Sequence, residues 1–390
     1  MQRKKLRLML REEDGNILIL TALLIAVFVG MLAFVLDLGH VHSVRYELQN
    51  GADACALRGA RAFFPDNGPF DNSAFSAPRS VSQAWTTIGK NPTDAAPLKD
   101  LSDVIVGLWD YQKQAFEYAY PEESAGSFTW PPPMQYWGRY IGPAVSLTTK
   151  REQAEQNYGP VGMTLAQIFG VTAVPMGSLA TAALSGVGSV GPGEVDLPMY
   201  ISKDFFTQPG LDLWNSRINL YPEQPTENAG WFTPPDVKNT TPPEFAKYIL
   251  GPEFGGKPFP SMQVSDGAFD SKDPPPYDYV YTQNGVDANL FKETQSCTPP
   301  KNHVGMLYWR WWYQTQCLGQ PWIIQLPVLA TSHQSNDPQP IVGFSEWEVV
   351  AVEEMPAKRI VIRPRSGVSP TGGGGGAFFG LLSLEPKLVR

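Results

Sequence analysis

Residues 15–64 have the sequence GNILILTALLIAVFVGMLAFVLDLGHVHSVRYELQNGADACALRGARAFF. Within this segment the run Ile17–Leu36 carries no charge, and only Thr21 has a hydroxyl group. At about 1.5 Å per residue, its length matches the roughly 30 Å hydrocarbon core of a bilayer. A helix buried in a soluble core would show one polar stripe, but every face of this run is apolar. The run therefore predicts a membrane-spanning helix.

The residues that flank this run set its expected orientation. Five Lys and Arg side chains lie among residues 1–15. Positively charged flanks stay in the cytoplasm, so the chain after Asp37 is expected to be exported. A secretory signal peptide is the alternative, but the run is longer than a signal h-region and no small-x-small cleavage site follows it. We therefore expect a retained, single-pass signal anchor with a cytoplasmic N-terminus.

The helix is expected to continue beyond the membrane until Pro65, which cannot extend it. Charged and polar side chains occupy most of its faces, but one stripe of apolar and small residues recurs at steps of three and four. The stripe consists of Val41, Val44, Leu48, Ala52, Cys55, Gly59 and Ala62. Small residues let another backbone approach closely. The stripe therefore predicts a surface for a partner helix, with packing on the chain's own sheet as the alternative.

Two motifs in this segment resemble those of a known family. Asp37-Leu38-Gly39 ends the apolar run, and residues 48–57 have the sequence LQNGADACAL. Together with the basic leader and the glycine before the span, they resemble the N-terminus of the TadE/TadG-like proteins of the Tad, or Flp, pilus-assembly system. The resemblance implies a pseudopilin-like, structural role in pilus assembly or cell adhesion at the bacterial inner membrane. It also implies other Tad pilus-assembly proteins as partners of the helix, alongside the lipid bilayer.

The sequence departs from this family's pattern in two places. Family members that are cleaved after the glycine carry a glutamate shortly after it, whereas no acidic residue lies between Gly15 and Asp37. The resemblance therefore does not imply cleavage after Gly15. Full-length TadG-type proteins often add a module whose metal site needs an Asp-x-Ser-x-Ser run, which this sequence lacks. The implied protein has the helical anchor without a metal-dependent adhesion module.

The composition after the anchor favours strands and loops, because 37 Pro and 36 Gly residues among 390 interrupt helices. Short helices are expected at Val81–Ile88 and Pro243–Leu250, and a short helical turn is expected at Thr164–Phe169. Runs rich in β-branched and aromatic residues predict antiparallel strands. These runs are Leu101–Asp110, Phe116–Tyr120, Ala144–Thr149, Val171–Leu184, Met306–Tyr313, Trp322–Leu329, Ile341–Val352 and Lys358–Ile362.

The expected fold is α+β, with a long N-terminal transmembrane and stalk helix followed by a mainly antiparallel β domain with long irregular loops. Residues 1–15 form the cytoplasmic basic leader and residues 16–64 the helix. Residues 65–365 form the exported β-rich domain, with an irregular insertion at about 205–300. Residues 366–390 form a linker and tail, because five consecutive glycines are typical of a flexible linker. The glycine-rich run at residues 186–193 is expected to be a loop.

Candidate chemistry is sparse, and we expect no enzyme, cofactor or metal site. The sequence holds no HExxH, GxSxG or CxxC motif. His40 and His42 are two residues apart on a helix and point in different directions. Asp266, Asp270 and Asp273 lack the spacing of an EF-hand. The chain after residue 15 carries about −10 of the net charge of −8, which argues against nucleic acid. An exported binding module or enzyme held by a signal anchor is the alternative function.

The expected export of the domain bears on its cysteines. Cys297 and Cys317 lie in one aromatic-rich segment, and an oxidising compartment permits a disulfide between them. Two unpaired buried thiols are the alternative. Cys55 lies on the stripe of the stalk helix and is expected to be a packing residue, because a single cysteine without a nearby base is a poor nucleophile.

Overall fold

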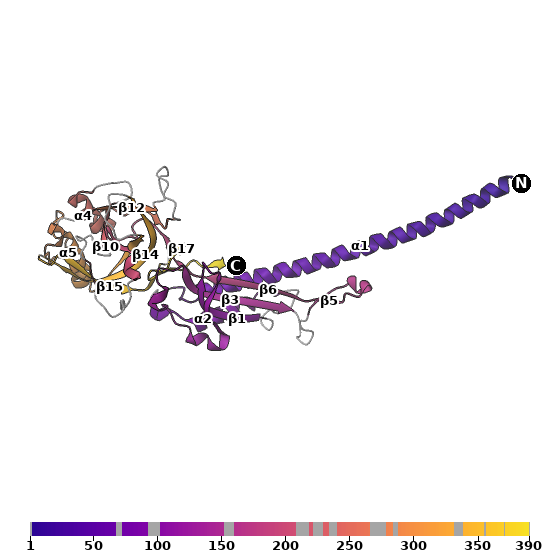
Figure 1. The fold of residues 1–390 in the computed structure, drawn as a ribbon, viewed down its shortest axis with the longest axis horizontal. Helices are drawn as coiled ribbons and strands as arrows, with labels where there is room; N and C mark the ends of the chain where they lie inside the picture. The colour runs from indigo at the N-terminus through magenta and orange to yellow at the C-terminus, as the bar shows by residue number, and fades with distance from the viewer. Residues whose placement is uncertain are drawn as a thin grey trace. The chain divides into compact units, whose positions relative to one another are not determined.

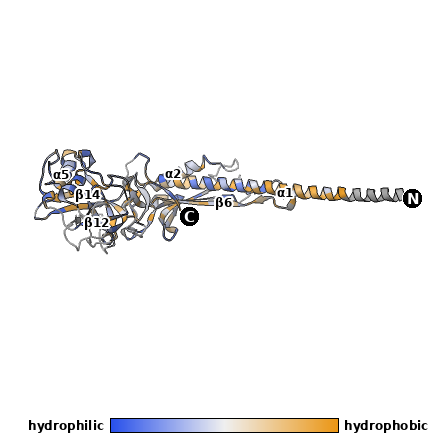
Figure 2. Cartoon of the chain, turned by 90° about the horizontal axis from the view of Figure 1, so that it is seen from above, coloured by the Kyte–Doolittle hydropathy of each residue, from blue (hydrophilic) through white to orange (hydrophobic). Residues whose placement is uncertain are grey.

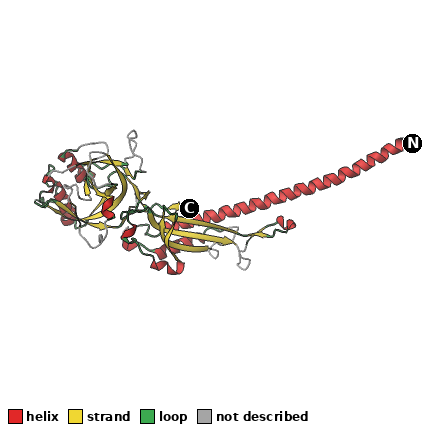
Figure 3. Cartoon of the chain, viewed as in Figure 1, coloured by secondary structure: helices red, strands yellow, loops and turns green. Residues whose placement is uncertain are grey.

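The computed structural model describes residues 2–67, 72–92, 102–151, 160–207, 218–220, 229–233, 240–265, 278–283, 288–330, 338–354, 356–369 and 371–389. It confirms the predicted α+β class: a long N-terminal helix precedes mostly antiparallel sheets (Figure 3). The chain divides into two compact units. One unit holds residues 1–55, 85–103 and 147–180, and the other holds residues 56–84, 104–146 and 181–390.

Helix α1 (Gln2–Arg61) includes both the predicted span and the predicted stalk (Figure 1). Hydropathy changes along it, from an almost wholly apolar part to a part with mixed faces (Figure 2). Among the described residues, one helix, Ile17–Arg61, is long and apolar enough to cross a membrane. Most side chains of the apolar run are exposed, and Leu18 is 72 % exposed. This part of α1 therefore has the surface that a lipid-embedded helix needs.

The first unit places a short hairpin beside α1. The hairpin is formed by β4 (Val161–Gly162) and β5 (Ala173–Val174), which pair antiparallel, with the 3-10 turn η5 (Ala166–Phe169) at its end. We call residues 161–174 the finger. After the finger, strand β6 (Met176–Ala183) runs beside the stalk, where Ser178 Oγ donates a hydrogen bond to the Leu48 carbonyl oxygen over 3.0 Å.

A five-stranded sheet has the order β19-β6-β3-β1-β2. Its other strands are β1 (Ser102–Asp110), β2 (Ala115–Pro121), β3 (Ile141–Arg151) and β19 (Lys387–Val389). The three strands predicted between residues 101 and 149 are therefore present with small shifts at their ends. Helix α2 (Ala77–Ile88) starts four residues earlier than predicted and lies on the stalk, where Ser80 Oγ donates to the Gly59 carbonyl oxygen over 2.8 Å.

A seven-stranded sheet in the second unit has the order β12-β10-β8-β13-β14-β15-β9. Its strands are β8 (Met199–Ser202), β9 (Ile218–Leu220), β10 (Ala229–Thr233), β12 (Tyr279–Gln283), β13 (Trp322–Leu329), β14 (Pro338–Glu353) and β15 (Arg359–Arg365). Because β12 also pairs with β14, five of these strands close on themselves. Tyr200, Phe232 and Phe344 belong to one fully buried cluster on this sheet.

A third sheet has the order β11-β7-β18-β16, with β17 paired to β7. Its strands are β7 (Gly186–Val190), β11 (Met262–Gln263), β16 (Gly367–Ser369), β17 (Gly373–Gly376) and β18 (Leu381–Ser383). The remaining α-helices are α3 (Lys203–Phe206), α4 (Pro242–Leu250) and α5 (Met306–Trp312). Single turns are η1 (Asn72–Ala74), η3 (Glu122–Ser127), η4 (Met134–Tyr136), η6 (Pro252–Phe254), η7 (Ala288–Phe291) and the π turn η8 (Tyr313–Cys317).

The prediction of a strand at Met306–Tyr313 is wrong, because most of this segment forms helix α5. Aromatic residues favour strands, but tertiary packing overrides that preference. Leu307 and Trp309 are fully buried, and Arg310 is buried beside them. Arg310 forms an ion pair with Glu253. Burial of these neighbouring positions follows a helical face rather than the alternation of a strand.

The prediction of a flexible linker and tail at 366–390 is also wrong. Strand β17 consists of four glycines and pairs antiparallel with β7, so the run at 186–193 is not simply a loop. A Cβ atom on Gly376 would lie 2.1 Å from the Val187 carbonyl oxygen, so glycine is required by close backbone approach. Phe378 and Phe379 are at most 1 % exposed. The C-terminal segment is therefore part of the core.

The irregular insertion predicted at about 205–300 is only partly described, and its described parts belong to the fold. Strands β10 and β12 pair with each other within the seven-stranded sheet. Trp231 and Phe245 are buried and their rings meet edge to face. The expectation of a surface decoration is therefore wrong for these parts. The acidic residues Asp266, Asp270 and Asp273 lie outside the described residues.

Cys297 and Cys317 form a disulfide whose Cα atoms are 5.8 Å apart. The bond joins the segment before α5 to the turn after it, and the two cysteines are 20 residues apart in sequence. A cross-link over a loop of this length contributes on the order of 3 kcal/mol to the free energy of unfolding.

Candidate functional site

The stripe predicted as a partner surface is buried in the structure. Leu48, Ala52 and Cys55 are completely buried, and Val44 is 1 % exposed. Gly59 and Ala62 are also buried, whereas Val41 is half-buried. In this structure the chain's own strands cover the stripe, which corrects the expectation that it is free for a partner helix. The physical reason is that water outside the membrane drives an apolar stripe onto the nearest apolar surface.

Gly59 shows how closely the end of α1 packs within the second unit. A Cβ atom built on Gly59 would lie 3.2 Å from Ala84 Cβ and 3.2 Å from Val145 Cγ1. Contacts this short leave no room for a larger side chain without movement of α2 or β3. The small residues at the end of the stripe therefore serve the close approach of α1 to its own fold.

Cys55 is a packing residue, as expected. It is the free cysteine of the described residues and is buried. Burial raises the pKa of its thiol to about 12. The thiol is therefore protonated at neutral pH, which leaves no thiolate for nucleophilic chemistry.

Asp37, at the end of the apolar run, ties the finger to α1. Its carboxylate accepts hydrogen bonds from the backbone N–H groups of Thr164 at 3.1 Å, of Leu165 at 2.8 Å, and of Ala166. Burial of the carboxylate opposes its ionisation, but these three donors outweigh that effect and hold the pKa of Asp37 below its ordinary value. The side chain is only 5 % exposed. The aspartate of the Asp-Leu-Gly motif thus has a structural role that links two distant parts of the chain.

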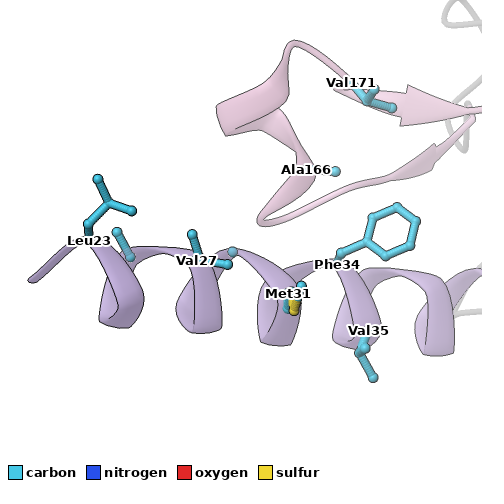
Figure 4. A pocket seen from close by; sticks show the side chains of 9 residues that line it. Leu23, Val27, Met31, Phe34, Val35, Ala166 and Val171 are labelled. Carbon is cyan, nitrogen blue, oxygen red and sulfur yellow. The ribbon is translucent and has the colours of Figure 1, made fainter. Parts of the chain in front are cut away.

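An apolar groove of about 820 Å³ lies between α1 and the finger (Figure 4). Ala166 and Val171 line its finger side. The side of α1 is lined by Leu23, Ala26, Val27, Gly30, Met31, Phe34 and Val35. All of these helix residues belong to the predicted span. The finger therefore lies beside the predicted span of α1 and not only beside the stalk.

The opposite face of the span is also uncovered. Phe28 lies nine residues before Asp37, which places it on the far side of the helix from the finger. Leu24, Phe28 and Leu32 are 49 %, 62 % and 61 % exposed. These side chains form an exposed apolar face of the span.

A second group of charged side chains lies in the other unit. Asp196 accepts the backbone N–H of Gln325 at 2.8 Å, and burial raises the pKa of its carboxyl group to about 7. It lines a small polar cavity together with Arg310 and Glu253, which form an ion pair. Arg310 also stacks over Phe254 at 5.2 Å. These contacts hold α5 against η6, and the cavity contains no Ser or Cys among its described lining residues.

Among the described residues, no group of three or more His, Cys, Asp or Glu side chains has the arrangement of a metal site. The absence of a cofactor or metal remains an expectation from the sequence.

The comparisons with known proteins address the N-terminal helix. Residues 15–62 match the family model described as putative Flp pilus-assembly TadE/G-like. The matched segment contains the apolar span, Asp37 and the buried stripe. No curated protein and no solved structure gives a significant match to the chain.

Sequence reasoning found the span and the stripe but missed the finger. Two signals pointed to it. Asp37 is the acidic residue that ends the span, so its charge needs a partner close to the membrane. The finger, in turn, contains no charged residue. The sequence does not show that Asp37 and the finger are partners, because the hydrogen bonds between them join residues 127 to 129 positions apart.

Proposed function

We propose that this chain is a membrane-anchored, pilin-like component of Tad, or Flp, pilus assembly, with a structural role and no enzymatic activity. The match of residues 15–62 to the TadE/G-like family model is the observation that supports it most strongly. The helix in the matched segment has a lipid-compatible span and a stalk that is built into the folded part of the chain. Such a helix joins a membrane anchor directly to an exported domain.

The partner surface in this proposal is the exposed face of the span around Phe28. The stripe from Val44 to Ala62 is already covered by the chain, so other Tad proteins have to meet α1 elsewhere. Lipid tails are as apolar as leucine and give no hydrophobic reason for helices to associate. Association within a membrane therefore depends on close van der Waals fit between helix surfaces.

This surface is tested by placing a photo-crosslinking amino acid at Phe28 in piliating cells. We expect crosslinks to another protein of the Tad machinery, because Phe28 is 62 % exposed on the single chain. The control position is Leu318, which is 47 % exposed but belongs to the segment after α5. Crosslinks from Phe28 to lipid alone, with full piliation, would argue against this partner surface.

The proposed orientation places the N-terminus in the cytoplasm and the sheets in the periplasm or outside the cell. The basic leader supports it through the positive-inside rule. Alkaline phosphatase fused after Val389 is expected to be active, because it folds only after export. An inactive fusion, together with an active cytoplasmic reporter at the same position, would reverse this orientation.

A further inference from the structure

The charges on either side of the span fix how deeply α1 sits in a membrane. Asp14 precedes the apolar run and Asp37 follows it. A charged side chain at the centre of a bilayer is costly, so the helix cannot slide far in either direction. Residues Leu23 to Val35 therefore lie within the hydrocarbon layer when the span is inserted.

The finger shares the groove with these residues and lies beside the part of the run that is closer to Asp37. Ala166 and Val171 line the finger side of the groove, across from Met31 and Phe34 (Figure 4). The tip of the finger also presents apolar side chains outward, since Ile168 is 78 % exposed and Val171 is 45 % exposed. Side chains of this kind would be solvated unfavourably in water but fit among lipid tails.

The composition of the finger suits the same environment. Residues 161–174 have the sequence VGMTLAQIFGVTAV, without a charged side chain. The side-chain amide of Gln167 is partly satisfied within the finger, because its Nε2 donates to the Met163 carbonyl oxygen over 2.6 Å. A loop that met only water would have no reason to exclude Lys, Asp and Glu so completely.

The printed N–H groups of the finger meet one requirement of a bilayer, which is that backbone donors find partners within the protein. Donors at the start of the finger bond to Asp37 or across the hairpin, as Met163 N–H does to the Thr172 carbonyl oxygen over 3.0 Å. Donors around the tip bond within it: Ile168 to Leu165, Gly170 to Gln167 and Val171 to Ala166. The Asp37 carboxylate therefore accepts hydrogen bonds from the three N–H groups at the start of the turn.

We infer that the tip of the finger, residues 165–171, inserts into the lipid bilayer beside α1 as a second membrane contact, with lipid acyl chains in the groove. Asp37 acts as the clasp that holds the tip at this depth. The partner is the hydrocarbon of the membrane itself. A protein helix in the groove is the competing occupant, and the experiment below separates the two.

The test uses the full chain with Cys55→Ala, reconstituted at about one copy per vesicle in phosphatidylcholine vesicles. A fluorophore is attached to a new cysteine, Ile168→Cys or, in a second variant, Val171→Cys. Quenching is measured with lipids that carry a nitroxide on the acyl chain and with iodide in the water. We expect strong quenching by the lipid nitroxide and weak quenching by iodide at both positions.

Two reference positions make the result interpretable. Leu179→Cys is a matched control, because Leu179 is an exposed apolar residue of the same unit, at 60 % exposure. Its carbonyl oxygen accepts a hydrogen bond from Gln49, which lies about 18 Å farther along α1 than Asp37. It should be quenched by iodide and not by the lipid. Phe28→Cys reports whether the span itself is inserted.

The possible outcomes distinguish insertion of the finger from insertion of the span. If Phe28→Cys is quenched by the lipid nitroxide but positions 168 and 171 are quenched only by iodide, the span is inserted and the finger is not. The inference about the finger is then wrong. Lipid would then not occupy the groove, and a protein helix would be the remaining occupant. If Phe28→Cys is not quenched by lipid, the anchor itself is wrong. Adding Asp37→Ala should shift label 168 from lipid to iodide quenching, whereas Asp53→Ala should leave it unchanged.

Discussion

Replacing Gly59 by leucine is expected to lower the free energy of unfolding by about 3 kcal/mol, because the side chain has no space. Even a Cβ atom at this position would come within 3.3 Å of Ala84 Cβ and of both methyl groups of Val145. An isobutyl group has to displace α2 or β3, and the better helix propensity of leucine offsets only a part of that cost. Thermal unfolding of the full chain in detergent should shift down by roughly 5–10 °C.

Gly39→Leu is the matched control for this prediction. It makes the same change in the same helix, but no atom lies within 4 Å of a Cβ built on Gly39. We expect its unfolding temperature to stay close to that of the unmodified chain. If Gly59→Leu unfolds at the same temperature as Gly39→Leu, then α1 does not pack on the fold at Gly59. The stripe would in that case again be available to a partner.

The N-terminal helix was the part of the fold best predicted from sequence. Its apolar run and its heptad-like stripe depend on local spacing, which a sequence displays directly. What covers the stripe was not predicted, because Val145 and Ser178 are far from it in sequence. A stripe of small residues fits a partner helix and the chain's own sheet equally well. Only the structure shows that the sheet covers it.

Local composition misled the interpretation of two later segments. MLYWRWWY has the residues of a strand, yet α5 buries Trp309 and pairs Arg310 with Glu253. The five glycines before Ala377 have the composition of a linker, yet four of them form β17 against β7. In both segments the deciding contact is distant in sequence. Propensity is a weak guide where tertiary contacts decide.

The clasp at Asp37 belongs to the same class of feature. The Asp-Leu-Gly motif was recognised, but its physical role depends on backbone N–H groups of residues 164–166. Every residue except proline has a backbone N–H group, so the sequence does not show which of these groups bind Asp37. The uncharged composition of the finger is a visible consequence of its location, although it becomes informative only once the finger is placed beside the span.

The proposed function depends most on whether the span does more than anchor the chain. A swap variant addresses this: residues 17–36 are replaced by an unrelated apolar sequence of equal length that keeps Ala26, Gly30 and Ala33 facing the finger. Such a span still crosses the bilayer, because length and hydrophobicity are preserved. It loses the surface shape around Phe28, on which close packing with another helix depends.

Counting pili on cells that carry this swap variant tests the account most directly. The chain should accumulate in the membrane at its normal level, and the clasp at Asp37 should still protect the amides of residues 164–166 from hydrogen exchange. We predict that piliation nevertheless falls to the level of a strain that lacks the protein. Normal piliation with the swapped span would contradict the account. The helix would then be an anchor only, and the exported domain would have to carry the function.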